Sequence, residues 1–306
     1  MTAFLLGRFA RALLTLWAVL TLVFVLIHAT GDPIAVLAPE QMNAAERAAL
    51  AASLGLDRPL LVQYLRFIVG VLHGNLGFSY YSGVPALPLL AARVPVTLEL
   101  VALAILIAVA VGVPLGIAAA LRPESVADRA LRGLSVLGAS VPTFFLGIVL
   151  IFFFSVETNL LPASGAGGLR HFIMPAFTLA FFRIAFFTRL VRSALLESLA
   201  QPYVRTARAK GLSEAVVVLK HALRPAALPL VTVFGLQFGQ LFAGTVITET
   251  IFALPGMNRL ALEALFRLDY PIILSYVLVA ASMFVALNFA TDVLYGVIDP
   301  RVRHAR

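Results

Sequence analysis

Side chains able to act as nucleophiles, general bases or metal ligands are few in this chain of 306 residues, and they are scattered. The histidines at positions 28, 73, 171, 221 and 304 lie far apart, and there is no cysteine. The sequence contains no phosphate-binding loop, no His-Glu-x-x-His pair and no nucleophile elbow. We therefore expect no catalysis, no bound cofactor or metal, and no hydrolysis of a nucleotide by this chain alone.

Four polar side chains stand out because they lie in or beside long apolar stretches: Arg183, Gln237, Gln240 and Glu249. Polar groups are costly in lipid, so they face protein or a water-filled path. We predict that these four line a water-filled pathway or an interface. For Glu249, at the end of a span, solvation or pairing at the membrane interface is the simpler interpretation. For Arg183 a structural pair and a place on the pathway are equally consistent with the sequence.

The composition places these residues in a membrane protein, since 61% of the chain is hydrophobic, 12% is charged and the mean hydropathy is +0.99. Uncharged runs of about 20 residues, enough to cross a hydrocarbon layer of roughly 30 Å, cover 12–31, 100–121, 133–156, 225–248 and 270–291. A sixth run, 172–191, contains Arg183 and Arg189. We count it as a span because six crossings give a consistent distribution of charged residues among the loops, and five do not. We predict an all-α, polytopic membrane protein with six transmembrane helices.

Basic residues predict the orientation of these spans. With six spans, most of the 23 Lys and Arg residues fall on the side that holds both termini. Positive charge is enriched in cytoplasmic loops, so we expect both termini and the basic segment 197–225 in the cytoplasm. The net charge of +8 then reflects topology and some attraction to anionic lipid. Because the basic residues are dispersed among loops, binding of nucleic acid is not expected.

The segment 31–95, after the first span, is expected outside the cell. Asn43 and Glu46 form a capping-box pattern at the start of a helix that ends at Gly55. A second helix after Pro59 places Leu61, Leu65, Ile68 and Leu72 on one stripe, which predicts that this stripe packs against apolar material. Two short helices make a cap or collar and no independent catalytic domain.

Two short helices joined by a tight elbow are predicted within 197–225. Pro202 suits the first position of a helix, and the residues that follow it to Lys210 favour helix. Gly211 fits the left-handed residue beyond the helix end. Ser213 can cap the second helix, and we expect that helix to end near Arg224, because Pro225 disfavours a helical residue before it.

Residues 203–213 read YVRTARAKGLS and residues 221–225 read HALRP. This pattern resembles the EAA loop of the permease subunits of ABC importers, most closely the dipeptide, oligopeptide and nickel branch. The general family pattern is Glu-Ala-Ala, three residues, Gly, nine residues and Ile-x-Leu-Pro. Here Arg205, Thr206 and Ala207 replace the first three residues, Gly211 is kept, and the final proline is one position late at Pro225.

The resemblance extends over nearly the whole chain. Further matching segments are 31–33 (GDP), 55–59 (GLDRP), 95–99 (PVTLE), 249–252 (ETIF), 255–256 (PG), 269–271 (DYP) and 299–301 (DPR). It implies a type I ABC importer permease fold, with 1–95 as first span plus extracytoplasmic segment, 96–296 as permease core and 297–306 as cytoplasmic tail.

The resemblance also implies partners. These are two cytoplasmic ATPase subunits that bind the ATP and Mg²⁺, a second homologous permease, an extracytoplasmic solute-binding protein and membrane lipid, all at the inner membrane of a prokaryote. The residues implied in coupling to the ATPase are Tyr203, Arg205, Thr206, Ala207, Lys210, Gly211 and Leu212. Tyr203, Ala207 and Gly211 recur every four residues and form one stripe. Two of the three, Ala207 and Gly211, are small, which lets a partner surface approach closely. An amphipathic helix lying on lipid is the alternative interpretation of that stripe.

The implied function is ATP-driven import of di- and oligopeptides or similar solutes by alternating access. A permease for a nickel chelate or glutathione is the nearest alternative. A membrane scaffold that anchors partners without passage of solute is the alternative from another class, and a sealed pathway with no solute-dependent stimulation of ATPase activity would distinguish it.

Overall fold

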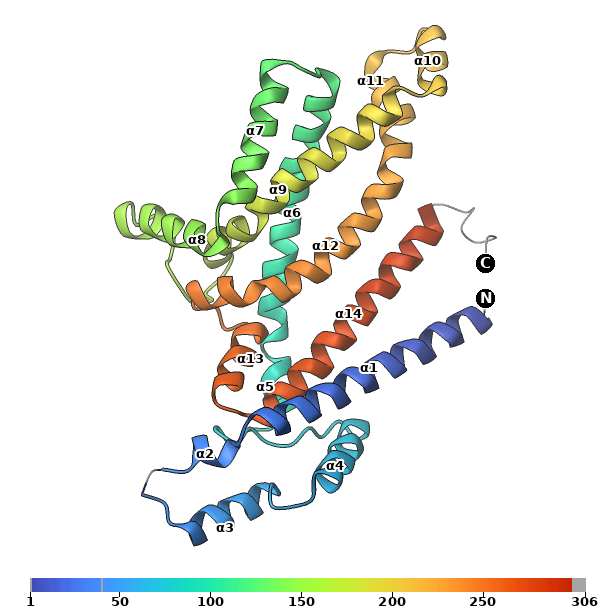
Figure 1. Ribbon diagram of the computed structural model, residues 1–306. Coiled ribbons are helices and arrows are strands. Elements are labelled where there is room, and N and C mark those ends of the chain that lie inside the picture. Colours follow the sequence, from blue (N-terminus) through green and yellow to red (C-terminus); the bar gives the residue numbers. More distant parts are fainter. Residues whose placement is uncertain (1, 40, 299–306) are drawn as a thin grey trace. The chain divides into compact units, whose positions relative to one another are not determined.

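The computed structural model describes residues 2–39 and 41–298, and about 78% of it is helical. Within these residues there is no strand, only an isolated bridge between Phe78 and Pro85, so the all-α prediction is confirmed. The chain divides into two compact units, Met1–Pro95 with Pro255–Ala286, and Val96–Leu254 with Leu287–Arg306. The two units are described separately, and Figure 1 gives the order of their elements. Most of the expected tail 297–306 lies outside the described residues.

The first unit consists of helices and connecting segments. Its elements are α1 (Thr2–Thr30), α2 (Pro33–Leu37), α3 (Ala44–Leu54), α4 (Leu60–Leu72), α5 (Ala86–Ala91), α13 (Met257–Phe266) and the first part of α14 (Tyr270–Ile298). Local chemistry sets the bounds of α3 as the sequence predicts. Asn43 and Glu46 form the capping box, and Gly55 ends the helix at φ +71°.

The start of α14 holds the first unit together. Tyr270 is 2% exposed. Its hydroxyl lies 2.8 Å from the carbonyl oxygen of Ile27 and 2.7 Å from that of Gly31, so it provides a hydrogen-bond partner for backbone carbonyls at the end of α1. The neighbouring Asp269 is also buried. It accepts hydrogen bonds from Ser79 Oγ at 2.5 Å and from the Tyr80 amide at 3.1 Å, which ties the loop before α5 to α14.

The second unit contains three long helices of 28 to 30 residues, α6, α9 and α12. Its elements are α6 (Val94–Leu121), α7 (Val126–Ser140), α8 (Thr143–Ile151), the π-helix η1 (Phe152–Glu157), α9 (Arg170–Leu199), α10 (Pro202–Ala209), α11 (Glu214–Val216), the π-helix η2 (Val217–Ala222) and α12 (Leu223–Ile251). Helix α9 is central, because it packs against α7, α8 and α12 (Figure 1).

Two glycines allow α6 to approach α9 closely. A β-carbon at Gly112 would lie 3.0 Å from the carbonyl oxygen of Ile184, and one at Gly116 would lie 2.7 Å from the carbonyl oxygen of Thr188. The Thr188 hydroxyl also donates a 3.3 Å hydrogen bond to the Gly112 carbonyl. Small residues four apart commonly permit such contacts between membrane helices.

Four described helical stretches are long and apolar enough to cross a membrane: Ala10–Thr30, Ala86–Leu121, Arg170–Leu199 and Tyr270–Phe289. The expected continuous span over 133–156 is wrong, because the helix breaks between α7 and α8. Pro142 has extended backbone there, lacks an amide hydrogen and disfavours a helical residue before it. Figure 1 shows α8 turned away from the direction of α7. The count of six spans stays a prediction.

The apolar stripe of α4 does not pack inside the first unit, and its predicted contact with apolar material stays a prediction. Leu61, Leu65 and Leu72 are 67%, 54% and 79% exposed, so they do not pack in the interior. The other side of the helix, with Tyr64 and Phe67, packs against the buried core of the first unit instead. The aromatic side chains of Tyr64 and Phe67 therefore attach α4 to the first unit, while the leucine stripe faces outward.

We predict that Gly116→Ala destabilises the protein by about 1–3 kcal/mol. The added methyl group would overlap the Thr188 carbonyl and the Val191 β-carbon, and neither can move without a shift of the α9 backbone. The measurement is the thermal unfolding midpoint in mild detergent. Gly244→Ala is the matched control, since a β-carbon at Gly244 in α12 has nothing within 4 Å. Equal midpoints for the two variants would contradict close packing of α6 on α9.

Candidate functional site

The segment 197–225 forms a hairpin of short helices beyond the ends of α9 and α12, as Figure 1 shows. Helix α10 begins with Pro202 in its first turn, as predicted, and is capped by Lys210. Gly211 follows with φ +76° and open space around its β-position, so the elbow requires a left-handed residue and leaves room around it. Ser213 occupies the N-cap of α11 with extended backbone, but its side chain makes no capping hydrogen bond.

A charge pair crosses the elbow. Arg208 donates to both carboxylate oxygens of Glu214, at 3.1 Å from Nε and 2.6 Å from Nη2. The hydrogen bond from Arg208 lowers the pKa of the Glu214 carboxyl. Both side chains are exposed, so the pair contributes little to stability.

The inner face of the hairpin is an apolar core. Val204 and Ala207 of α10 are buried against Val217, Val218 and Ala222 of η2, together with Ala120 and Leu195. A polar contact sits at its edge, where Ser198 Oγ donates to the Ala222 carbonyl at 2.8 Å and lies 2.8 Å from the Tyr203 hydroxyl. The hairpin is therefore attached to the end of α9 and the start of α12 at once.

The sequence-predicted coupling residues divide between two faces. Ala207 is 5% exposed and belongs to the inner core, so it faces its own chain. Tyr203 is 42% exposed, while Arg205, Thr206, Lys210, Gly211 and Leu212 are exposed. The exposed surface also includes Val216 and Leu219, which sequence reasoning did not single out. Their spacing of three residues after the elbow is the signal that could have identified them.

The expected helix end near Arg224 is wrong. The chain is helical without interruption from Glu214 to Ile251, and Pro225 lies in the first turn of α12. The π-helical turn η2 precedes it, with the Leu223 amide bonded to the Val218 carbonyl. A wider turn shifts the hydrogen-bond pattern by one residue, so the missing amide of Pro225 and its ring are accommodated.

Of the polar residues proposed for a pathway or interface, Glu249 is completely buried. Its Oε1 accepts hydrogen bonds from Thr97 at 2.7 Å and Thr245 at 2.9 Å, which links α12 to the start of α6. Arg183 Nε and Gln237 Oε1 are buried and have no hydrogen-bond partner among the described residues, while Gln240 is exposed. The hydrogen bonds of the described part do not join the four into one site.

A buried ion pair at the start of α7 escaped the sequence analysis. Both oxygens of Asp128, which is fully buried, accept hydrogen bonds from Arg192 of α9, at 2.6 and 2.7 Å. The Glu124 amide also donates to it, and Arg132 lies 3.4 Å away. The Arg192 hydrogen bonds lower the pKa of Asp128 to about 2. Nothing local in the sequence pairs two residues 64 positions apart.

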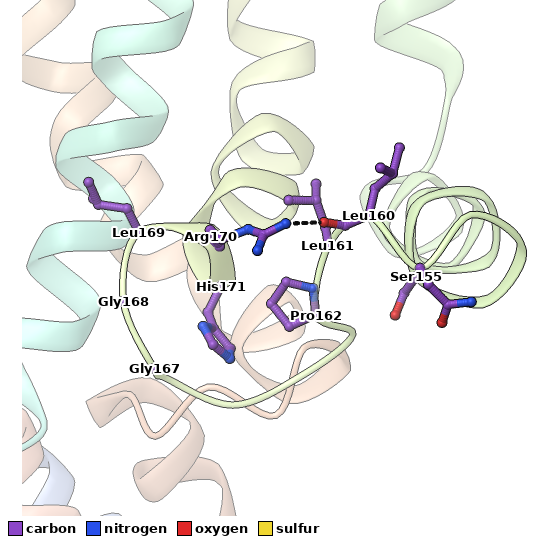
Figure 2. Close-up of a pocket in the computed structure, with 10 residues that line it drawn as sticks. Ser155, Leu160, Leu161, Pro162, Gly167, Gly168, Leu169, Arg170 and His171 are labelled. Carbon is purple, nitrogen blue, oxygen red and sulfur yellow. Dashed lines mark hydrogen bonds between the residues drawn. The ribbon is translucent and has the colours of Figure 1, made fainter.

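A cavity of about 510 Å³ lies between the end of η1 and the start of α9 (Figure 2). Arg170 there donates a 2.7 Å hydrogen bond to the Leu160 carbonyl, and His171 Nδ1 is buried without a hydrogen-bond partner in the described part. In the described residues no group of three His, Cys, Asp or Glu side chains is placed to hold a metal. The cavity offers an arginine and an imidazole without a nucleophile paired to a base.

Comparison with known proteins gives a consistent result over the chain. Residues 112–304 match the family model described as binding-protein-dependent transport system inner membrane component. Residues 1–101 match the model of the N-terminal part of such membrane components.

Individual relatives cover the full length. The chain is 40% identical to the dipeptide transport system permease protein of Escherichia coli, with 100% of both chains covered. It is 40% identical to the glutathione transport system permease protein of Salmonella typhi, over 99% of this chain and 100% of that one. Among solved structures, an inward-facing form of the methionine ABC transporter MetNI matches with a TM-score of 0.56 and 21% identity, over 69% of this chain and 96% of that one.

The Asp128–Arg192 pair predicts a pH dependence of stability. The pKa of Asp128 lies below the value of about 3.9 in an unfolded chain, so its stabilisation is complete above about pH 5 and is lost as the pH falls toward 2. Unfolding midpoints measured between pH 6 and pH 3 should fall less steeply for Asp128→Asn than for the wild type. Asp57→Asn, at an exposed position, is the control and should keep the wild-type slope. A wild-type slope in Asp128→Asn would contradict the assignment.

Proposed function

The chain belongs to the family of binding-protein-dependent transport system inner membrane components, and we propose that its segment 197–225 is the contact with the ATPase subunits of the transporter. As a member of this family it is a multi-pass membrane permease subunit of an ABC importer, and separate subunits hydrolyse ATP. The observation that carries the proposal is the hairpin itself, which has a buried inner face fixed to α9 and α12 and an exposed outer face.

The outer face has the chemistry of a docking surface. Arg205 and Lys210 supply positive charge, while Leu212, Val216 and Leu219 supply apolar area at 39%, 39% and 62% exposure. Apolar centres with charged surroundings are typical of specific protein interfaces. Thr206 and Tyr203 add hydroxyl groups beside them. The role of Ala207 is to pack α10 against its own chain, and Gly211 sets the direction in which the surface points.

The attachment of the hairpin explains how motion would pass into the membrane. Ser198 at the end of α9 lies within hydrogen-bond distance of both the Tyr203 hydroxyl of α10 and the Ala222 carbonyl at the end of η2. A displacement of α10 therefore acts on α9 and α12 together. Closure of the ATPase subunits on ATP then favours one arrangement of these helices over another. ATP can shift that equilibrium only as far as the ATPases bind the two arrangements with different free energies.

The partners and placement follow from the same proposal. They comprise two ATPase subunits, a second homologous permease and an extracytoplasmic solute-binding protein, with both termini and the hairpin on the cytoplasmic side of a prokaryotic inner membrane. The permease core is 96–296, and Arg183, Gln237, Gln240 and Glu249 are its candidates for lining the pathway or an interface. The predicted positive-inside pattern supports this orientation.

We infer that the transported solute is a di- or oligopeptide, which the similarity to the dipeptide permease supports. Glutathione, itself a small peptide, is the second candidate and has the same level of support in sequence identity. Uptake of labelled dipeptide and of labelled glutathione by the assembled transporter separates the two.

We predict that Gly211→Asp uncouples transport. An aspartate at φ +76° carries backbone strain of about 1 kcal/mol and adds a negative charge beside Arg208 and Lys210, so the outer face is tilted and its charge reduced. The chain should still insert and assemble, while solute-stimulated ATP hydrolysis and uptake in vesicles should fall at least tenfold.

Gly55→Asp is the matched control for this variant, because Gly55 has φ +71°, open space around its β-position and a place outside the hairpin. It should retain transport. Normal uptake by Gly211→Asp, or equal losses in both variants, would contradict the assignment of the coupling role.

A further inference from the structure

Helix α4 has two faces with different environments. One face packs against α1: Tyr64 and Thr21 share a 2.7 Å hydrogen bond between their hydroxyl groups, and the rings of Phe67 and Phe24 stack with centroids 5.7 Å apart. The amide oxygen of Gln63 lies 3.2 Å from Nε2 of His28. These contacts attach α4 to one defined stretch of α1.

That stretch lies inside the part of α1 that crosses the membrane. The crossing stretch is Ala10–Thr30, and the contacts of α4 fall between Thr21 and His28. Thr21 lies nine residues before Thr30, which is about 14 Å along a helix that rises 1.5 Å per residue. A helix held beside these residues cannot stand clear of a hydrocarbon layer of roughly 30 Å, even when α1 is tilted by the usual 20° or so.

The opposite face of α4 is apolar and exposed. Leu61, Leu65, Val69 and Leu72 are 67%, 54%, 53% and 79% exposed. The same half of α1 exposes further apolar side chains, namely Leu22, Val25 and Leu26 at 59%, 55% and 49%. Both helices therefore expose apolar side chains, and they do so at overlapping depths in the membrane.

We propose that α4 is an embedded helix of the non-cytoplasmic leaflet and that its exposed face contacts lipid acyl chains. The 31–95 segment is then only partly an aqueous loop. Burying apolar side chains in acyl chains stabilises this placement by about 25 cal/mol per Å² removed from water. Arg66 is the single charged residue of α4, and its long aliphatic stem lets the guanidinium reach the headgroup layer.

Lipid is favoured over a protein partner by continuity. Helix α1 is a membrane span with only 17% of its most apolar stretch buried, and α4 extends that lipid-compatible surface with no acidic group and one basic group.

The natural absence of cysteine in this chain lets single cysteines be introduced and labelled selectively. Cysteines at Leu61 and Leu65 each carry a nitroxide label. The full transporter, with cysteine-free partner subunits, is reconstituted in vesicles of phosphatidylethanolamine and phosphatidylglycerol. Collision of the label with oxygen, which concentrates in acyl chains, is compared with collision with a water-soluble nickel chelate. Leu22→Cys in α1 is the membrane control and Ala49→Cys in α3 the control for the aqueous segment. Retained ATPase stimulation shows that each labelled complex is folded.

We expect the α4 labels to favour oxygen over the nickel chelate by several-fold, as at Leu22→Cys, with the opposite ratio at Ala49→Cys. A water-like ratio at Leu61→Cys and Leu65→Cys would overturn the proposal by placing α4 in the aqueous phase. Low accessibility to both reagents in the assembled transporter would also overturn it, since another subunit would then cover the face.

Discussion

The burial of Val204 and Ala207 against η2 and Leu195 is the interaction on which the arrangement of the coupling segment depends. A helix of eight residues such as α10 is marginal in isolation, so tertiary packing must hold it in place. Because its inner face is fixed to both α9 and α12, its outer face has a defined position. A contact that transmits motion needs this combination, since a loosely attached helix would absorb the displacement of its partner.

Backbone geometry on either side of α10 serves the same end. Gly211 turns the chain sharply at its C-terminal end, and the π-turn η2 lets the helix continue through Pro225 into α12. The hairpin is thus joined to the second long helix without a flexible loop. In the same unit, Asp128 and Arg192 bond α7 to α9, and Gly112 and Gly116 bring α6 against α9. Helix α9 is therefore bonded or closely packed along its length.

Local chemistry made much of the fold predictable. The capping box at Asn43, the helix ends at Gly55 and Gly211, and the apolar spans follow from neighbouring residues or from composition. Contacts between distant residues were not predictable, as with Asp128 and Arg192. The position of Ala207 was undetermined for a similar reason, because a small residue suits a partner surface and an internal core equally well. Pro225 misled the prediction because the adjustment that tolerates it, a π-turn, has no clear sequence signal.

The most direct test of the coupling role is a crosslink from the outer face of the hairpin. A single cysteine at Lys210, carrying a photoreactive benzophenone, is placed in the assembled transporter. We expect a covalent adduct with an ATPase subunit on illumination, and none from the same probe at Ala49 of α3. If the ATPase subunits co-isolate with the labelled permease but Lys210→Cys forms no adduct with them, the hairpin does not contact them, which contradicts its coupling role.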